Sequence, residues 1–305
     1  MKGSGGTKPC CFCKNVVGKR TFLGRNRDGY FVTLAVAKYA HLDPHTDESL
    51  YEMADVLRDR QATAGKTVFK TLQQAFGLNF APHSCLFDAA LRPHIHPRAA
   101  VLWDWMHVLV CNGLVTNEAA MLIQVLRDAG VPLEALDAFT HSIHNLKGFP
   151  SSRMPCNFFR NRFHSSTSGP SLQAFAKEMM AVACALRLFI EMTLVPRRLL
   201  EPYYRCFLYL CTILDIVSLG DKAIALLPFL RRVVEAHHSL FADLYGVDST
   251  VPKHHYTMHL PDVIETLQVN VSAFTVERKH RCAKRIANRV FNNFEHTLAI
   301  GDTNI

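Results

Sequence analysis

The stretch that decides the fold is SLQAFAKEMMAVACALRLFIEMTLV, residues 171–195. Its apolar side chains recur every three or four residues, the spacing that places them on one face of an α-helix. Pro196 follows directly, and a proline disfavours continuation of a helix. The pattern predicts one long amphipathic helix over 171–195, whose buried face is formed by Leu172, Phe175, Met179, Leu186 and Ile190.

The same helical periodicity extends from about residue 116 to about residue 245. Further helices are predicted over 118–129, 133–146, 199–219 and 222–245. These helices form an apolar block at the centre of the chain. The expected fold class is therefore mainly α, with a small α/β part contributed by the two ends of the chain.

The segment that precedes this block has two predicted helices and one predicted strand. The first helix begins near Thr46, and the second covers 67–76 and stops at Gly77, a typical C-terminal cap. The short apolar run 99–103 predicts a buried strand that ends at Asp104. A helical turn over 105–111 is expected to follow.

The segment after the block is rich in histidine. Two His-rich turns are expected from Pro252 onward, and they lead into a final helix over about 273–298. A loop rich in serine and arginine is predicted within the block, over 147–170.

The composition excludes a disordered chain and favours a polyanionic partner. Of 305 residues, 49% are apolar and 20% charged, enough to bury a sizeable core. Lysine and arginine exceed the acids, giving a net charge of +8. The ten cysteines are scattered, and residues 1–6 have no apolar core, so reduced thiols in a cytosolic or nuclear protein are expected. The most apolar run, 206–219, is short and contains Asp215, so no membrane partner is expected.

Positive charge is concentrated in three segments, which predicts contacts to nucleic-acid phosphates. Residues 1–27 hold seven lysines or arginines and no acid, the pattern of a solvated basic loop. Residues 138–177 hold five and again no acid. Residues 278–289 hold six. The side chains predicted to bind DNA are Arg160, Arg162, Arg278, Lys279, Arg281, Arg285 and Arg289.

A zinc site is predicted near the start of the chain. Cys10 and Cys13 are separated by two residues, so their thiolates can bind one face of a tetrahedral zinc ion. His41 and His45 are the candidates for the other two ligands. The alternative is a cluster of reduced surface thiols.

Two acids, Asp104 and Glu277, have surroundings suited to a divalent metal. Asp104 follows the predicted strand, and Glu277 precedes the basic run 278–289. Magnesium bound by one or two carboxylates and by phosphate oxygens would need such a basic neighbourhood. The simpler alternatives are that Asp104 caps the next helix and that Glu277 lies on an ordinary solvated helix face.

Four motifs follow one another along the chain: GSGGTKPCCFCKNVV at 3–17, HTDES at 45–49, WDWMH at 103–107 and FTVERKHR at 274–281. In this order they resemble motifs of the transposases of CACTA-like, Plavaka and KDZ cut-and-paste DNA transposons. The resemblance implies a ribonuclease-H-like sheet interrupted by a long helical insertion, with three acids (DDE) that hold two Mg²⁺ or Mn²⁺ ions. It assigns Asp104 as the second acid, His107 as its motif partner and Glu277 as the third acid.

The resemblance also divides the chain and limits its expected activity. Residues 1–45 form a basic loop with the zinc knuckle, 46–115 and 247–305 the ribonuclease-H-like remnant, and 116–246 the helical insertion. The first acid would lie upstream of Lys2, and no acid near the start stands in an apolar strand pattern. We therefore expect an N-terminally truncated, nuclear, DNA-binding protein without strand-transfer activity, with self-association as a further candidate interaction.

Two other classes of protein fit parts of the sequence. In a non-enzymatic helical interaction protein, residues 116–245 would be the working part and the cysteines and Glu277 would be incidental. In a stand-alone zinc-binding module, the CxxC segment would carry the function. Neither a GxSxG elbow nor an HExxH zinc helix occurs, which argues against the hydrolases that those motifs mark.

Overall fold

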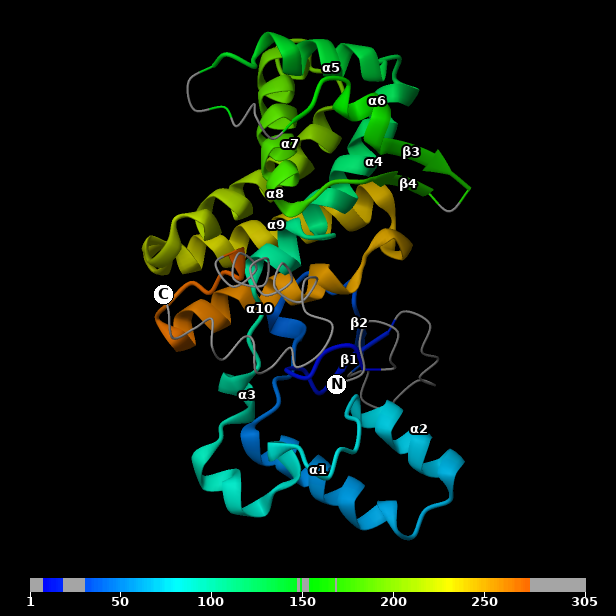
Figure 1. Cartoon of the computed structure of the whole chain (residues 1–305), viewed down its shortest axis with the longest axis vertical. Coiled ribbons are helices and arrows are strands. Elements are labelled where there is room, and N and C mark those ends of the chain that lie inside the picture. The colour runs from blue at the N-terminus through cyan, green and yellow to red at the C-terminus, as the bar shows by residue number, and fades with distance from the viewer. Residues whose placement is uncertain (1–7, 19–30, 147–148, 150–153, 168, 275–305) are drawn as a thin grey trace, which may run out of the picture.

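A computed structural model describes residues 8–18, 31–146, 149, 154–167 and 169–274, and these residues are mostly helical (Figure 1). This confirms the mainly α class. The α-helices are α1 (Asp47–Gln61), α2 (Lys66–Phe76), α3 (Pro97–Ala100), α4 (Leu114–Asp128), α5 (Leu133–Ser142), α6 (Phe158–Arg162), α7 (Ala176–Phe189), α8 (Glu201–Ser218), α9 (Leu227–Tyr245) and α10 (Pro252–Leu267).

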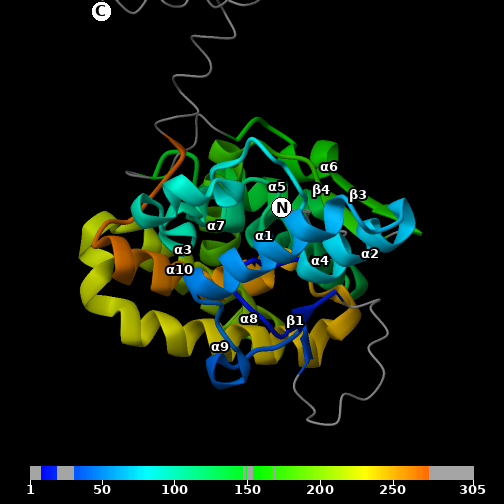
Figure 2. The ribbon, with the colours of Figure 1, turned by 90° about the horizontal axis from the view of Figure 1, so that it is seen from below.

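The helices lie in three tiers along the long axis of the molecule (Figure 1). The first tier holds α5, α6, α7 and part of α4, and the middle tier holds α8, α9 and α10. The third tier holds α1, α2 and α3. Seen from below, α8 and α9 run side by side, as their contacts also show (Figure 2).

One hydrophobic cluster joins the first two tiers. It is built from the apolar faces of α4, α7, α8, α9 and α10, with fully buried side chains such as Phe158, Phe207 and Leu122 at its centre. A smaller cluster under α1 and α2 contains Leu57 and Phe87. Packing of these faces, more than helix propensity, stabilises the helical block.

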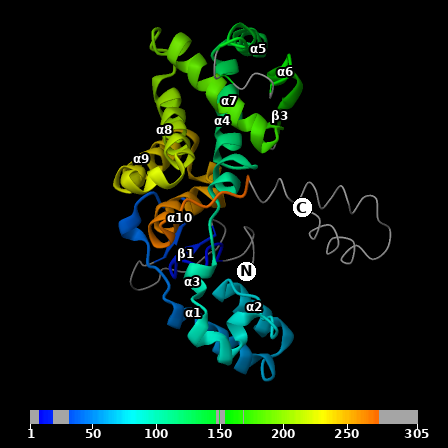
Figure 3. The ribbon, with the colours of Figure 1, turned by 60° about the vertical axis from the view of Figure 1, so that its left-hand side comes forward.

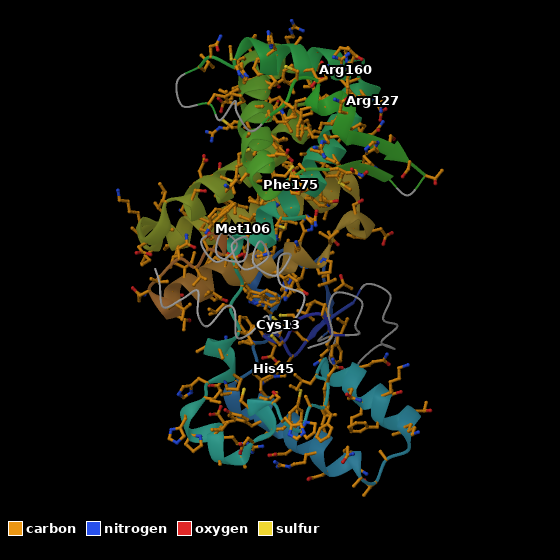
Figure 4. The ribbon with its side chains drawn as sticks, in the orientation of Figure 1. Cys13, His45, Met106, Arg127, Arg160 and Phe175 are labelled. Carbon is orange, nitrogen blue, oxygen red and sulfur yellow. The ribbon has the colours of Figure 1, made fainter. Side chains whose placement is uncertain are left out.

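Each predicted central helix is present, but several boundaries differ: α4 begins at Leu114, α5 ends at Ser142 and α9 begins at Leu227. The predicted helix 171–195 begins only at Ala176, because Ser171 and Leu172 belong to a hairpin of β3 (Phe163–Ser166) and β4 (Gly169–Leu172). Phe175 is consequently 75% exposed rather than buried (Figure 4). The segment predicted as the loop 147–170 thus contains α6 and most of the hairpin.

The predicted strand over 99–103 is wrong. Pro97 starts the single helical turn of α3, and residues 101–104 have no regular structure and pair with no strand in the described part of the chain. The only other strand pair described is β1 (Val16–Val17) with β2 (Val32–Thr33), which is parallel. The described residues therefore form two separate two-stranded sheets, and a ribonuclease-H-like sheet is not confirmed.

The two His-rich turns predicted from Pro252 are wrong as well, since Pro252–Leu267 is the single helix α10. Pro252 occupies the first turn, where a missing N–H costs nothing, and Pro261 is accommodated inside the helix. In Figure 3, α10 lies between β1 and α9. This places the histidines of α10 beside the start of the chain.

The described part of the predicted basic loop, residues 8–18, is packed rather than solvated. Phe12, Val16 and Val17 are buried, and Val263 of α10 belongs to the same apolar cluster as Phe12 and Val16. The remaining predicted basic loop and the predicted final helix from residue 275 lie outside the described residues. The predicted division of the chain into an insertion and a remnant stays a prediction.

One stretch, residues 106–128, is long and apolar enough to cross a membrane by length and composition alone. It comprises the π-helical turn η4 (Met106–Val110) and α4, and 61% of its most apolar window is buried inside the fold. A core helix of a soluble protein has these same properties.

Candidate metal centre

Four metal-binding side chains meet between the start of the chain and α10: Cys10, Cys13, His255 and His259. Their ligand atoms all lie within 4.8 Å of one another, and all four residues are buried. The Nε2 atom of His259 lies 3.3 Å from Cys10 Sγ, 3.5 Å from Cys13 Sγ and 3.0 Å from His255 Nε2.

Local structure holds each half of this Cys2His2 cluster. His255 and His259 are one helical turn apart on α10, so their rings project from the same face. The cysteine loop is fastened by hydrogen bonds from the Phe12 N–H to Cys10 Sγ and from the Tyr256 hydroxyl to the Pro9 carbonyl. The second of these bonds links the loop directly to α10.

Aromatic rings cover the cluster. The Trp103 ring stacks on Tyr256 at 4.0 Å and lies nearly parallel to His259 at 6.3 Å. The Phe12 ring meets His259 edge-on at 5.2 Å. These rings keep water away from the ligand atoms, which strengthens any electrostatic interaction inside the cluster.

Burial acts to lower the pKa values of the two histidines, whereas the neighbouring Cys10 acts to raise them. Burial lowers the pKa of His255. Burial also acts to lower the pKa of His259, but the attraction of Cys10 together with Asp262 outweighs it and raises that pKa to about 9. By contrast, burial raises the pKa of the neighbouring Cys11 thiol to about 12. Cys11 is not a member of the Cys2His2 cluster.

The residues present fit a tetrahedral metal ion with sulfur and nitrogen ligands. With zinc–sulfur bonds of about 2.3 Å and zinc–nitrogen bonds of about 2.0–2.1 Å, tetrahedral ligand atoms lie roughly 3.3–3.8 Å apart. The distances from His259 Nε2 to the two sulfur atoms, 3.3 and 3.5 Å, are close to this range. The structure thus contains a buried Cys/His cluster that could bind a metal ion.

The sequence-predicted histidine ligands, His41 and His45, are not members of this cluster. The His45 Nδ1 atom pairs with the Ser49 hydroxyl at 2.9 Å, and His41 is exposed (Figure 4 shows His45 near Cys13). The His45 N–H donates to the Phe12 carbonyl, so His45 supports the cysteine loop through its backbone. The spacing of four residues between His255 and His259, which places both on one face of a helix, was the signal in the sequence that could have identified the histidines beside Cys10 and Cys13.

Asp104 accepts hydrogen bonds with both carboxylate oxygens. One oxygen accepts from the His107 N–H at 3.0 Å and pairs with His107 Nδ1 at 2.6 Å. The other accepts from the Met106 N–H at 3.4 Å and from the Ala273 N–H at 2.7 Å. Asp104 thus caps the turn that follows it, as the simpler alternative held. It also fixes the chain at Ala273, 169 residues away.

The other predicted metal ligand, Glu277, lies outside the described residues, as do Arg278, Lys279, Arg281, Arg285 and Arg289. Among the described residues no second carboxylate joins Asp104 in a metal-binding group. These residues alone therefore do not form a magnesium or manganese site, and we derive no chemistry through such an ion.

The two predicted DNA-binding arginines of the helical block are half-buried or exposed at its far end. Arg160 Nε bonds Asp137 at 3.1 Å and its guanidinium also bonds Asn157, so it joins α5 to α6. Arg162 is half-buried. In Figure 4, Arg160 lies near Arg127 and far along the molecule from Cys13.

Lys253 is an unpredicted residue that supports this region. Its ammonium donates to the carbonyls of His107 at 2.6 Å and of Cys111 at 2.7 Å, which joins α10 to the turn after Asp104. Because charge-assisted hydrogen bonds are lost, Lys253→Met is expected to lower the free energy of unfolding by about 2 kcal/mol. Urea denaturation checks this value. An unchanged midpoint, with Lys177→Met as the exposed control, would contradict it.

The chain matches no family model, no curated protein and no solved structure. The fold and the centre by themselves define a helix-rich protein with a buried cluster able to hold a metal ion.

Proposed function

We propose that this chain is a transposase-derived DNA-binding protein that resembles the DDE transposases of CACTA-like, Plavaka and KDZ transposons. The observation that carries the proposal is the hydrogen bond from the Ala273 N–H to Asp104. Glu277 comes four residues after Ala273 in the sequence. The hydrogen bond therefore brings the chain next to Asp104, the proposed second acid, four residues before Glu277, the proposed third acid. Trp105 and Phe274 extend this contact, with ring centroids 5.6 Å apart.

In this proposal the Cys2His2 cluster holds a structural zinc ion. Four protein ligands close the coordination of the ion, as in structural zinc sites, and leave no position for a substrate. The ion would fix the cysteine loop on α10. Because Trp103 covers the cluster and adjoins Asp104, the zinc site would also hold Asp104 in place.

The basic residues of 278–289 would bind DNA, and the protein would act in the nucleus. We expect residues 1–305 to have no strand-transfer activity. Two-metal phosphoryl transfer needs a carboxylate that bridges both ions. Only Asp104 and Glu277 stand in positions that match the family's acids. His107 positions Asp104 through its imidazole, which bonds that carboxylate.

DNA binding is tested by mobility shift on arbitrary duplex DNA across a salt series. Charge reversal of Arg278, Arg281 and Arg285 removes three phosphate contacts, so the slope of log K against log salt should fall by about 3. The matched control reverses three exposed charges on α1 and α2: Arg60, Lys66 and Lys70. No binding at low salt, or equal losses in both variants, would contradict the proposal and favour the helical interaction protein.

The predicted lack of strand transfer is tested separately. The purified chain with Mg²⁺ or Mn²⁺ is expected to leave supercoiled DNA uncut. Metal-dependent nicking that disappears in Asp104→Ala would show that the chain is a complete enzyme. Zinc content, measured on the same Asp104→Ala sample, should stay unchanged and serves as its control for folding.

A further inference from the structure

A second group of metal-binding side chains lies in the helical block and shares no residue with the Cys2His2 cluster. Glu118 of α4, Cys206 of α8 and His237 of α9 have ligand atoms within 4.8 Å of one another. Their exposed fractions are 1%, 0% and 0%. Three helices from distant parts of the sequence thus direct one oxygen, one sulfur and one nitrogen ligand to a common point.

The burial of Glu118 is unfavourable without a cation. One of its carboxylate oxygens is 2.6 Å from His237 Nε2, and the other is buried with no hydrogen-bond partner. Leaving a carboxylate oxygen desolvated and unpaired costs about 1–3 kcal/mol or more. The flanking residues on the same helix, Ala119 and Leu122, are ordinary core residues. A metal ion at this place would give the second oxygen the partner that it lacks.

The hydrogen bonds around His237 set its ring in the form that a metal requires. His238 Nε2 lies 2.6 Å from the carbonyl oxygen of His254, which can only accept, so this nitrogen carries a proton. In neutral His238 the Nδ1 atom is then an acceptor, and it faces His237 Nδ1 at 2.9 Å. His237 Nδ1 must therefore carry the proton of that bond. Its Nε2 lone pair is left to face Glu118 and Cys206.

A metal-bound histidine donates its other ring N–H to an acceptor, which fixes the tautomer and the ring orientation. Here the acceptor is His238, which is itself anchored to the backbone of α10 through the His254 carbonyl. The same hydrogen bonds join α9 to α10 within the core.

We propose that Glu118, Cys206 and His237 bind a second zinc ion, which joins α4, α8 and α9. Zinc accepts oxygen, sulfur and nitrogen ligands together, whereas magnesium and calcium prefer oxygen alone. With the carboxylate and the thiolate ionised, the two ligand charges cancel the charge of the ion, so the filled site is neutral in the core. A water molecule supplies the fourth ligand.

Zinc replaces protons at this site. The 2.6 Å separation of Glu118 and His237 is that of one shared proton, and Cys206 carries a second proton on its sulfur. Both protons pass to the solvent when the ion binds, and the oxygen and nitrogen atoms separate to about 3.3 Å. No electron is transferred and no bond other than those to the protons is broken.

The test counts zinc ions in the full chain and in variants. Wild-type protein purified with zinc is expected to contain about two ions per chain. Cys10→Ser/Cys13→Ser should retain one of them, and adding Cys206→Ser should remove it. The matched control is Cys211→Ser, added in the same background, because Cys211 is also a buried cysteine of α8 but is not in the group. Zinc retained in the Cys206→Ser variant would overturn the proposal.

A second measurement needs no variant and so does not depend on folding. X-ray absorption at the zinc edge of the wild-type chain should give an average of about 1.5 sulfur ligands per zinc, because one site has two thiolates and the other has one. One ion per chain with two sulfur ligands would overturn this proposal and leave the zinc of the Cys2His2 cluster in place. The converse result, one ion per chain with one sulfur ligand, would overturn only the earlier proposal of zinc in the Cys2His2 cluster.

Discussion

The Cys10→Ser/Cys13→Ser chain is expected to lose one bound zinc ion and to unfold at a markedly lower temperature. A ligand that binds only the folded chain, at a thousand times its Kd, stabilises that chain by about 4 kcal/mol. For a chain of this size the loss corresponds to a fall in Tm of roughly 6 °C. Zinc analysis and calorimetry measure the two effects.

The control for this experiment is Cys11→Ser. Cys11 lies between the two ligands in sequence, but it is only half-buried and is absent from the cluster. We expect the Cys11→Ser chain to keep its zinc and nearly its full Tm. Equal zinc content in the double variant and the wild type would mean that the cluster binds no metal.

Gly113→Ala is expected to be the most damaging single substitution in the turn that follows Asp104. Gly113 joins η4 to α4, and a Cβ atom at this position would overlap the carbonyl group of Leu109 and lie 2.6 Å from the Val108 oxygen. Both neighbours are backbone atoms and cannot rotate away. Forced overlap of this kind destabilises a protein by on the order of 3 kcal/mol, or roughly 5 °C in Tm for a chain of this size.

The matched substitution is Gly65→Ala. Gly65 also precedes a helix, α2, but no atom lies within 4 Å of the position that a Cβ would take, and its φ of −60° suits any residue. Its Tm should therefore change by less than about 2 °C. A similar fall in Tm for the two glycine variants would show that close packing at Gly113 is not the cause.

Helix positions were predictable because their signals are local. Thr46 caps α1, with its hydroxyl accepting from the Ser49 N–H, and Gly77 ends α2 at a φ of 69°. Such caps and the 3.6-residue periodicity need no knowledge of the rest of the fold. The signals failed where a local reading was ambiguous. The histidine-rich sequence after Pro252 suggested two turns where the structure has the single helix α10. The apolar run 99–103 suggested a strand, although no partner strand is described beside it.

The candidate sites were only half predictable. The CxxC spacing identifies Cys10 and Cys13, but it carries no information about ligands elsewhere in the chain. It therefore predicts the nearest histidine pair in the sequence, His41 and His45, as the other two ligands. The true neighbours of Cys10 come 245 or more residues later. Glu118 and Cys206 gave no signal, since neither forms a recognised metal-ligand spacing with another residue of its own helix.

The sequence by itself determined the long helices of the central block, the two cysteines of the candidate metal centre and the positive charge at 278–289. Only the tertiary structure decided which histidines meet the cysteines, which polar groups share the core of the helical block, and that Asp104 contacts the chain before Glu277. The physical reason is the distance along the chain over which each interaction acts. Helix periodicity and capping act over a few residues, whereas a metal centre depends on which faces of distant helices are buried against one another.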